Sequence, residues 1–297
     1  MMNVALVTGA TGFIGSNLCN SLHDKGYTVY AIGVKDEITP RCHKLYEMPL
    51  EKLNWKEIPN IDICFHQAAN NDTTEKNYDK LHKANVELTF TLFNQLLQEK
   101  NCKNFIYASS CSIYGNRPTP YDEFKTDPDP LNPYAESKMM MEMLSNKFAY
   151  ENSVKTIGLR YTNVYGKNEF HKGKRASMIY QLIEKIKTNE IVKLFNYGDQ
   201  KRDWVYVQDV VEANIKASKA NVSGIYNVGS GVSTSFNEVI KIIDNILGKK
   251  TKIEYIDCPF KEAYQNHTAV DLTRAKNDLN YLPVWSIEEA INDILKK

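Results

Sequence analysis

Short apolar runs alternate with helical patterns along the first half of the chain. Four runs of this kind are residues 4–7, 28–32, 61–65 and 105–108. Continuous apolar runs of this length are typical of strands that are buried on both faces of a sheet. Between the third and fourth runs, apolar residues recur at helical spacing, at Leu81, Ala84, Leu88, Leu92 and Leu96. Strands alternating with helices predict an α/β fold with a doubly wound parallel sheet.

The second half of the chain has a different rhythm. Residues 117–133 carry five prolines and predict a surface loop, followed by a helix over 134–150 and a strand over 156–160. Beyond Gly166 we expect helices over 176–188, 236–247 and 287–295, and strands over 192–195, 205–207, 224–228 and 252–256. The strand 224–228 is expected to close the main sheet. We therefore predict a Rossmann-type domain of residues 1–166 plus roughly 203–230. A smaller, interleaved C-terminal α/β substrate lobe takes residues 167–202 plus 231–297.

Residues 8–15, with the sequence TGATGFIG, join the first predicted strand to the first predicted helix. At such a junction a bound dinucleotide requires small residues. Gly9 permits a tight turn, Gly12 lets the backbone approach the pyrophosphate, and Gly15 lets the helix pack closely on the strand. The helix N-terminus adds unpaired N–H groups and a partial positive charge for the phosphates. The alternative is a strand–helix turn with incidental glycines, which the position directly after the first strand disfavours.

The second predicted strand ends without the acidic residue that holds the adenosine ribose in many folds of this kind. It continues into Gly33, Val34 and Lys35, with Arg41 nearby. A carboxylate would repel a 2′-phosphate, whereas Gly33 and Lys35 tolerate one, so we predict NADP as the cofactor in preference to NAD. The alternative is that Lys35 is a solvated loop lysine and that Asp36 takes the role of the acid.

Tyr134 and Lys138 form a Y-x-x-x-K pair, one helical turn apart and on the same face. A lysine ammonium beside a phenol stabilises the phenolate and lowers the pKa of the tyrosine, which makes the tyrosine a usable base. Ser110 follows the predicted strand 105–108. Because ligands bind at the carboxyl ends of strands in open α/β sheets, Ser110 is placed to bind the same substrate hydroxyl. We therefore predict that Tyr134, Lys138 and Ser110 are catalytic.

Four stretches together resemble a known family. They are residues 8–15 (TGATGFIG), 109–115 (SSCSIYG), 134–138 (YAESK) and 160–166 (RYTNVYG). They resemble the extended short-chain dehydrogenase/reductase family of nucleotide-sugar epimerases and dehydratases, and the resemblance covers essentially the whole chain. In that family a serine or threonine four residues before the tyrosine of the YG pair assists catalysis, and Ser110 occupies this position. Dehydratases follow it with an Asp-Glu pair, whereas this chain has Cys111 and Ser112, so dehydration is not expected.

Further stretches resemble, within that family, the ADP-glycero-manno-heptose 6-epimerases, and among them is the motif His171-Lys172-Gly173. The resemblance implies that Lys172 is a second acid/base, which faces the tyrosine across the sugar. The residues implied to hold the nucleotide sugar are Ser110, Asn163, Phe195, Arg202 and Tyr264. Those implied to hold the cofactor are Phe13, Ile14, Gln67, Ala68, Ala69, Asn85 and Lys138. This chain departs from the pattern at Lys174 and Gln181, two positions that face the substrate in the family, so the identity of the sugar stays open.

Several of these residues have a plainer interpretation from the sequence alone. Arg202 suits a diphosphate because a guanidinium binds two oxygens, and the alternative is an exposed ion pair with Asp203. Asn163 is either a ligand or a turn former. Lys172 is either a catalytic group or a solvated lysine in a polar loop. His66 is expected to be a hydrogen-bonded histidine at a strand end rather than a catalytic group.

The composition excludes several classes of protein. The chain has 37 basic and 36 acidic side chains and a net charge of +1, so no field of one sign exists to attract nucleic acid or an anionic membrane. Six scattered cysteines without a C-x-x-C pair argue against a disulfide framework or a zinc site and fit a reducing cytoplasm. The sequence has neither a signal-peptide pattern at its start nor an apolar run of membrane-spanning length. We therefore expect a cytoplasmic enzyme without a metal, which forms a homo-oligomer (a dimer or larger).

Together these features predict a nucleotide-sugar epimerase that oxidises a sugar hydroxyl and re-reduces the keto-sugar through bound NADP(H), with no net redox change. The best match is a heptose 6-epimerase. Three alternatives stay open: a UDP-glucose/UDP-galactose 4-epimerase, a keto-sugar reductase with net consumption of NADPH, and a nucleotide-binding protein without activity. The intact set of Ser110, Tyr134 and Lys138 argues against the last of these.

Overall fold

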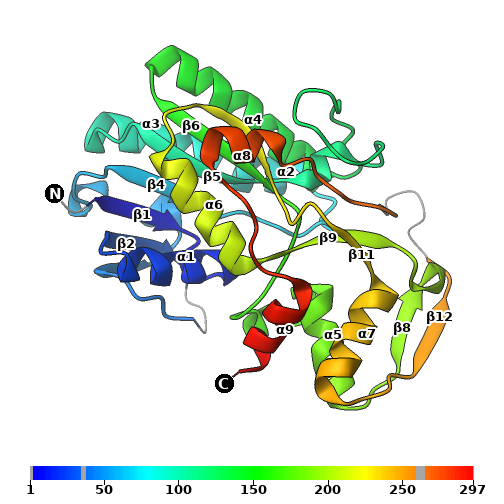
Figure 1. Cartoon of the computed structure of the whole chain (residues 1–297). Helices are drawn as coiled ribbons and strands as arrows, with labels where there is room; N and C mark the ends of the chain where they lie inside the picture. The colour runs from blue at the N-terminus through cyan, green and yellow to red at the C-terminus, as the bar shows by residue number, and fades with distance from the viewer. Residues whose placement is uncertain (1–2, 35–37, 259–264, 297) are drawn as a thin grey trace.

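The computed structural model describes residues 3–34, 38–258 and 265–296. At its centre is a seven-stranded parallel sheet with the strand order β10-β6-β5-β4-β1-β2-β3 (Figure 1). The strands are β1 (Val4–Thr8), β2 (Thr28–Gly33), β3 (Lys44–Glu47), β4 (Ile63–His66), β5 (Asn104–Ser110), β6 (Lys155–Tyr161) and β10 (Gly224–Val228). The strand order reverses between β1 and β4. In open α/β sheets ligands bind at the carboxyl ends of the strands beside such a reversal.

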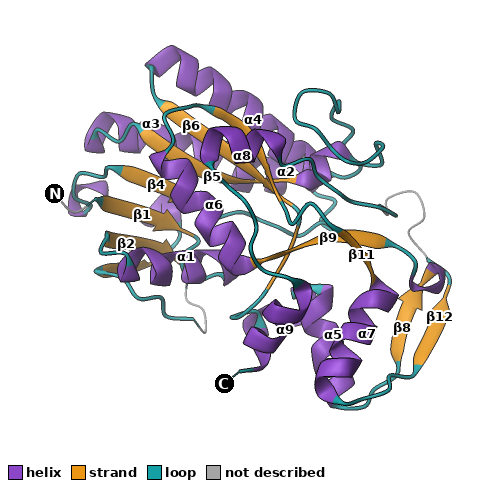
Figure 2. Ribbon diagram, viewed as in Figure 1, coloured by secondary structure: helices purple, strands orange, loops and turns teal. Residues whose placement is uncertain are grey.

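Helices cover both faces of this sheet (Figure 2). One face is covered by α1 (Phe13–Asp24), α6 (Val207–Lys219) and α8 (Thr273–Leu279), which share an apolar core with the strands. The other face is covered by α3 (Leu88–Lys100) and α4 (Pro133–Asn152), and α3 follows α2 (Tyr78–His82) and the π-helical turn η3 (Lys83–Glu87). Burial on both faces explains why the strands appear in the sequence as continuous apolar runs. The predicted doubly wound Rossmann-type sheet is confirmed.

The smaller lobe is built from two short sheets and three helices. One sheet has the strand order β11-β9-β7, with β7 (Asn163–Tyr165), β9 (Lys201–Tyr206) and β11 (Ser233–Ser235); the other pairs β8 (Val192–Phe195) with β12 (Ile253–Ile256). Its helices are α5 (Met178–Lys187), α7 (Phe236–Leu247) and α9 (Ile287–Leu295), which bury a separate apolar core. Capping boxes at Ser235 with Glu238 and at Ser286 with Glu289 fix where α7 and α9 begin.

The chain passes between the two lobes more than once (Figure 1). After β9 it returns to the main sheet as α6 and β10, and after β12 it returns again as α8 before ending in α9. Residues 273–281, which the sequence analysis placed in the smaller lobe, bury Ala275, Leu279 and Tyr281 in the core of the main sheet. The tail of the chain therefore packs on both lobes.

Short helical turns complete the described structure. They are η1 (Leu50–Lys52), η2 (Trp55–Glu57), η4 (Cys111–Tyr114), η5 (Phe170–Arg175) and η6 (Asn196–Gly198). Of these, η4 and η5 bear on the candidate site. In the described parts of the chain, no helix combines the length and apolar character that crossing a bilayer requires.

Candidate active site

A cavity of about 750 Å³ opens at the carboxyl ends of β1, β2, β4 and β5, at the reversal of the strand order. The parts of the chain that line it include the glycine turn after β1, the ends of the main-sheet strands with the start of α4, and the turn η5 of the smaller lobe. The residues predicted as catalytic, Ser110, Tyr134, Lys138 and Lys172, all line this one cavity. The structure therefore brings together groups that lie far apart in the sequence.

The glycine turn has the geometry that a dinucleotide requires. Gly9 has φ +64°, and a Cβ there would lie 2.7 Å from the backbone nitrogen of Ala68. A Cβ on Gly15 would collide with the carbonyl oxygen of Gly9. Gly12 is the N-cap of α1 and makes no side-chain capping hydrogen bond, so the N–H groups of the first turn have no side-chain partner there. An uncapped helix N-terminus beside close-packed glycines fits a pyrophosphate.

Gly33 ends β2 at the rim of the same cavity. A Cβ there would lie 2.5 Å from the hydroxyl oxygen of Thr11, which donates a hydrogen bond to the carbonyl oxygen of Val34 at 2.9 Å. Close packing on Thr11 explains the glycine, and it leaves the strand end without an acidic side chain. Lys35 lies outside the described residues. Arg41 pairs with Asp24 at 2.6 Å.

Gln67, Ala68 and Ala69 follow β4 and line the cavity, as the resemblance implied. The Gln67 side chain accepts a hydrogen bond from the hydroxyl of Tyr161 at 3.0 Å and donates one to Asn214 at 3.0 Å. These hydrogen bonds to Tyr161 and Asn214 fix the position of the Gln67 amide.

Asn85, also predicted to hold the cofactor, is absent from the described residues that line the cavity. Its amide donates to the carbonyl oxygen of Asn70 at 3.0 Å and to the hydroxyl of Ser137 at 2.9 Å, and it accepts from the backbone N–H of Asn70 at 2.8 Å. Because its hydrogen bonds go to the protein, Asn85 fixes the cavity-lining loop at Asn70 and supports the site from behind.

The start of α4 places Tyr134 at the cavity. Asn132 caps the helix by accepting a hydrogen bond from the backbone N–H of Ala135 at 2.9 Å, and Pro133 occupies the first helical position. Lys138 follows one turn later and is 2% exposed. Its ammonium donates to the carbonyl oxygen of Ala108 at 2.8 Å and lies 6.0 Å from the centroid of the Tyr134 ring.

The electrostatics of this pair differ from the sequence-based expectation. Lys138 was expected to lower the pKa of Tyr134, but the pKa of Tyr134 is raised, because burial disfavours the phenolate more than a hydrogen bond with Ser110 favours it. The ammonium of Lys138 is directed to Ala108 rather than to the phenol oxygen. Burial in turn lowers the pKa of Lys138 from 10.5 to about 8, and the nearby Glu142 opposes this change.

Lys172 enters the cavity from η5. Its ammonium lies 4.8 Å from the centroid of the Phe13 ring and 3.5 Å from a carboxylate oxygen of Glu169. Glu169 is fully buried and accepts hydrogen bonds from the backbone N–H of Gly166 at 2.9 Å and of Ser177 at 2.6 Å. These contacts fix Lys172 in the lining of the cavity, so it is not a solvated loop lysine.

Of the residues that the resemblance assigned to the nucleotide sugar, Ser110 lines this cavity. Asn163, Phe195 and Arg202 do not line it, and Tyr264 lies outside the described residues. Arg202 is 7% exposed and packs over the ring of Phe236 at 5.8 Å. The expected alternative, an exposed ion pair with Asp203, is wrong, because both residues are buried and Asp203 accepts hydrogen bonds from the turn at residues 230–231.

Lys174 and Gln181, the two departures from the family pattern, are also outside the described lining of the cavity. Gln181 donates hydrogen bonds to the backbone carbonyls of Lys174 at 3.3 Å and Ala176 at 2.8 Å, which braces the end of η5. The sequence analysis missed Arg175, which does line the cavity. Its position three residues after Lys172, in the same basic stretch of the chain, was the available signal.

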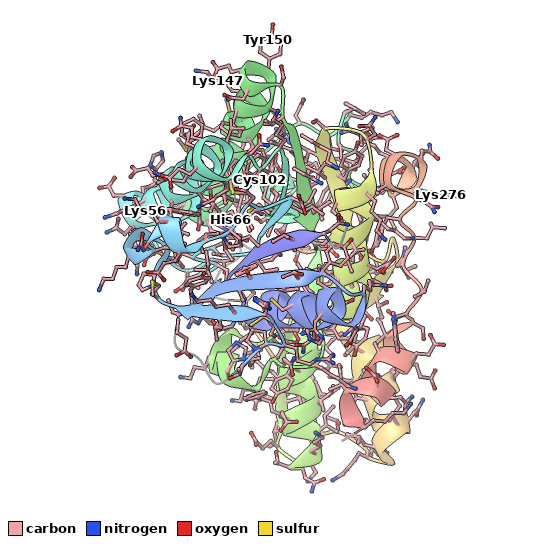
Figure 3. The ribbon with its side chains drawn as sticks, turned by 90° about the vertical axis from the view of Figure 1, so that its left-hand side faces the viewer. Lys56, His66, Cys102, Lys147, Tyr150 and Lys276 are labelled. Atoms are coloured by element: carbon pink, nitrogen blue, oxygen red, sulfur yellow. The ribbon has the colours of Figure 1, made fainter. Side chains whose placement is uncertain are left out.

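His66, labelled in Figure 3, ends β4. It is 2% exposed. Its two ring nitrogens lie 2.6 Å from the hydroxyl of Thr8 and 2.8 Å from that of Thr89. Burial, together with the charge of Lys138, lowers the pKa of His66 to about 3. The His66 ring is therefore neutral, and both of its nitrogens have hydrogen-bonding partners, as expected. Within the described chain, no cluster of side chains is suited to a metal ion.

The chain is similar in sequence and in fold to known proteins. The chain matches the NAD dependent epimerase/dehydratase family over residues 5–229. It is 34% identical over 289 residues to the ADP-L-glycero-D-manno-heptose-6-epimerase of Brachyspira hyodysenteriae, and the match covers 91% of this chain and 90% of that protein. The crystal structure of the Helicobacter pylori ADP-L-glycero-D-manno-heptose-6-epimerase has a TM-score of 0.86 at 34% identity, covering 99% of this chain and 95% of the other.

A UDP-glucose 4-epimerase from Thermotoga maritima, in a crystal structure with UDP-glucose, has a TM-score of 0.88 at 28% identity, covering 98% of this chain and 97% of the other. These matches confirm the predicted fold and the predicted class of enzyme. The glycine turn, Ser110 and the pair Tyr134 and Lys138 all lie within the residues that the family match covers. The chain belongs to the NAD dependent epimerase/dehydratase family.

Proposed function

We propose that this enzyme inverts a carbon of a nucleotide-linked sugar by transient oxidation and re-reduction, and that its substrate is an ADP-linked glycero-manno-heptose, inverted at C6. The observation that carries the proposal is that Tyr134 and Lys172, two side chains able to transfer a proton, enter one cavity from different lobes. Inversion requires proton transfer on both faces of the sugar, whereas a simple reductase requires only one such group. The two heptose epimerases that match this chain at 34% identity support the choice of sugar.

The roles of the side chains follow from their positions. A nicotinamide dinucleotide at the glycine turn supplies the acceptor and the donor of hydride. Tyr134 takes the proton of the sugar hydroxyl, and Ser110, which interacts with the phenol, holds that hydroxyl. Lys138, buried behind the tyrosine, stabilises the phenolate as it forms. Lys172 transfers a proton on the opposite face after the keto-sugar has turned.

The experiment that tests this proposal is incubation with a panel of nucleotide sugars that includes both C6 epimers of ADP-glycero-manno-heptose, UDP-glucose and UDP-galactose. Products are identified by NMR, and NADPH absorbance is followed in parallel. Interconversion of the heptose epimers without net change in absorbance is the expected result. Turnover of UDP-galactose without any conversion of the ADP-heptoses would contradict the heptose assignment. It would favour a 4-epimerase, the class of enzyme that the Thermotoga maritima structure represents. Stoichiometric loss of NADPH would identify a keto-sugar reductase.

We propose NADP as the preferred form of the cofactor. Support comes from the end of β2, where Gly33 and Val34 carry no acid to repel a 2′-phosphate. Arg41 is paired with Asp24, so in this proposal Lys35 is the cation that binds the phosphate. Titration of the apoenzyme with each dinucleotide tests the choice. Affinity tenfold better for NAD, about 1.4 kcal/mol, would contradict it.

We further propose that the protein is a cytoplasmic homo-oligomer. All six cysteines are free thiols, which fits a reducing compartment. Exposed apolar side chains on α3 and α4, Phe90, Met140, Met143 and Tyr150, support self-association. Figure 3 shows Tyr150 pointing away from the body of the molecule at the end of α4. Sedimentation velocity that shows a monomer at micromolar concentration would contradict the oligomer.

A further inference from the structure

Glu142 lies one helical turn beyond Lys138, so Tyr134, Lys138 and Glu142 form a row along one face of α4. The first two members of this row belong to the candidate active site. Glu142 does not line the cavity and is 4% exposed. A charged side chain buried directly behind a catalytic pair calls for a physical explanation, because an ionised carboxylate is costly to bury.

The row on α4 meets the end of β5. The carbonyl oxygen of Ala108 accepts a hydrogen bond from Lys138 at 2.8 Å, and the hydroxyl of Ser109 donates one to Glu142 at 2.5 Å. The next residue of the strand, Ser110, interacts with Tyr134. Three consecutive residues of β5 are thus held by three successive turns of α4.

Arg160, on the neighbouring strand β6, fixes the carboxylate from the other side. Its Nε donates to Glu142 Oε1 at 2.9 Å and its terminal nitrogen to Oε2 at 2.7 Å. The guanidinium lies 4.6 Å over the ring of Tyr114, which holds it in place. A buried ion pair adds little net stability compared with apolar residues of the same size. Its position beside Lys138 therefore points to a role in the reaction.

We propose that Glu142 is a positioning residue, whose carboxylate, fixed by Arg160 and Ser109, keeps the buried ammonium of Lys138 charged. This inference rests on the proposed function, because it assigns a role within the same site. Lys138 must carry its charge to stabilise a phenolate, and the resemblance also implies that it holds the cofactor.

The surrounding charges support this role. Burial lowers the pKa of Lys138 to about 8, and the nearby charge of Glu142 opposes this change by raising the pKa. Among the described residues, the other titratable or charged groups that face Lys138 or Glu142 are Tyr134, Arg160, His66, Tyr107 and Cys111. Burial keeps His66 neutral by lowering its pKa, and it keeps Tyr107 and Cys111 neutral by raising theirs. Glu142 is the acidic member of this set. Without it, Lys138 would lose its proton at a lower pH.

The first test measures NADPH affinity as a function of pH by cofactor fluorescence. In the wild-type enzyme, affinity is expected to fall at alkaline pH as Lys138 loses its charge. In E142Q this fall should begin about one pH unit lower, since an opposite charge nearby shifts a pKa by about one unit or more. E142D retains the charge and should leave the fall at its wild-type pH. A wild-type profile without an alkaline fall overturns the proposal.

E142Q leaves Arg160 as a buried cation without its partner, which destabilises the fold. The double variant E142Q/R160M removes both charges, and a melting curve shows which variants are folded. The double variant removes a cation together with the carboxylate, and a nearby like charge disfavours a charged lysine, so its alkaline fall should be displaced in the same direction as in E142Q but by less. An alkaline fall that stays at the wild-type pH in the folded variants overturns the proposal.

The second test measures kcat/KM against pH with the nucleotide sugar that the panel identifies. A purely structural role for Glu142 would lower kcat/KM at every pH without moving the profile, and that outcome overturns the proposal. The expected result is a displacement of the alkaline limb that matches the NADPH measurement. If no nucleotide sugar is turned over, the proposed function fails, while the NADPH measurement still decides the role of Glu142.

Discussion

The ammonium of Lys172 lies 4.8 Å from the ring centroid of Phe13, the first residue of α1. Through this contact, a side chain of the smaller lobe is fixed over the helix whose N-terminus fits the cofactor phosphates. The fully buried carboxylate of Glu169 holds the ammonium from the other side at 3.5 Å. Lys172 is therefore positioned by contacts to both lobes, which a proton donor at a fixed distance from the sugar requires.

Removal of the Tyr134 hydroxyl should abolish proton transfer while leaving the cofactor in place. Tyr134→Phe retains the ring and the packing at the start of α4, and we expect kcat to fall by about 10²- to 10⁴-fold. NADPH affinity, measured by fluorescence, should stay within about twofold of wild type. Turnover at the wild-type rate would contradict the assignment of Tyr134 as the base.

Replacement of Lys172 should stop inversion without stopping hydride transfer. In Lys172→Met we expect kcat for epimerisation to fall by about 10²-fold or more. Reduction of bound cofactor by the nucleotide sugar in a single turnover should persist, because Tyr134 still removes the first proton. Lys174→Met is the matched control, since Lys174 is an exposed lysine of the same turn. Equal losses in the two variants would show that Lys172 acts only through the charge of η5.

Because Gly15 packs closely on the backbone of Gly9, a side chain at this position should destabilise the protein. In Gly15→Ala the new Cβ collides with the carbonyl oxygen of Gly9, and we expect a loss of about 1–3 kcal/mol in the free energy of unfolding. Cofactor affinity should fall as well, because the turn must move. Gly26→Ala is the control: Gly26 has φ +80° with open space around it, so the variant should lose about 1 kcal/mol and keep its cofactor affinity.

The buried ammonium of Lys138 should cost the protein stability at neutral pH. Its folded-state pKa of about 8 lies below the ordinary value of 10.5, a difference that corresponds to about 3 kcal/mol. The cost is fully present below pH 8. It shrinks as the pH rises from about 8 to 10.5, because the folded protein gives up the proton first. Lys138→Met should therefore be inactive and yet more stable than wild type at about pH 7, by up to this amount less the lost hydrogen bond to Ala108.

Urea unfolding of both proteins at about pH 7 and about pH 9.5 checks this prediction. The stability advantage of Lys138→Met should be smaller at the higher pH. An advantage that grows with pH would have the wrong sign and would contradict the lowered pKa of Lys138.

The sequence predicted those parts of the fold and site that depend on local patterns. Apolar runs gave the strands of the main sheet, and α7 and α9 begin and end where expected. Helix α6 was missed, because it begins at Val207 directly after β9 without a turn residue. The strand β3, with one buried residue of four, lacks the apolar run that marked its neighbours.

The site shows the same division. The glycine turn and the pair Tyr134 and Lys138 were predictable, because each depends only on the spacing of residues within one turn or one helix. The raised pKa of Tyr134 was not, because it depends on burial by segments distant in the sequence. The supporting role of Asn85 was not predictable either, because it rests on hydrogen bonds from the Asn85 amide to Asn70 and Ser137. Such properties arise only when the chain is folded.

The crossings of the chain between the lobes limit how this enzyme can be altered. No single cut separates the segments that build the cofactor side from those that build the sugar side, because α6, β10 and α8 return to the main sheet between elements of the smaller lobe. A new sugar specificity therefore cannot be introduced by exchanging one contiguous block. Several separate stretches would have to be replaced together, and neither half is expected to melt independently of the other.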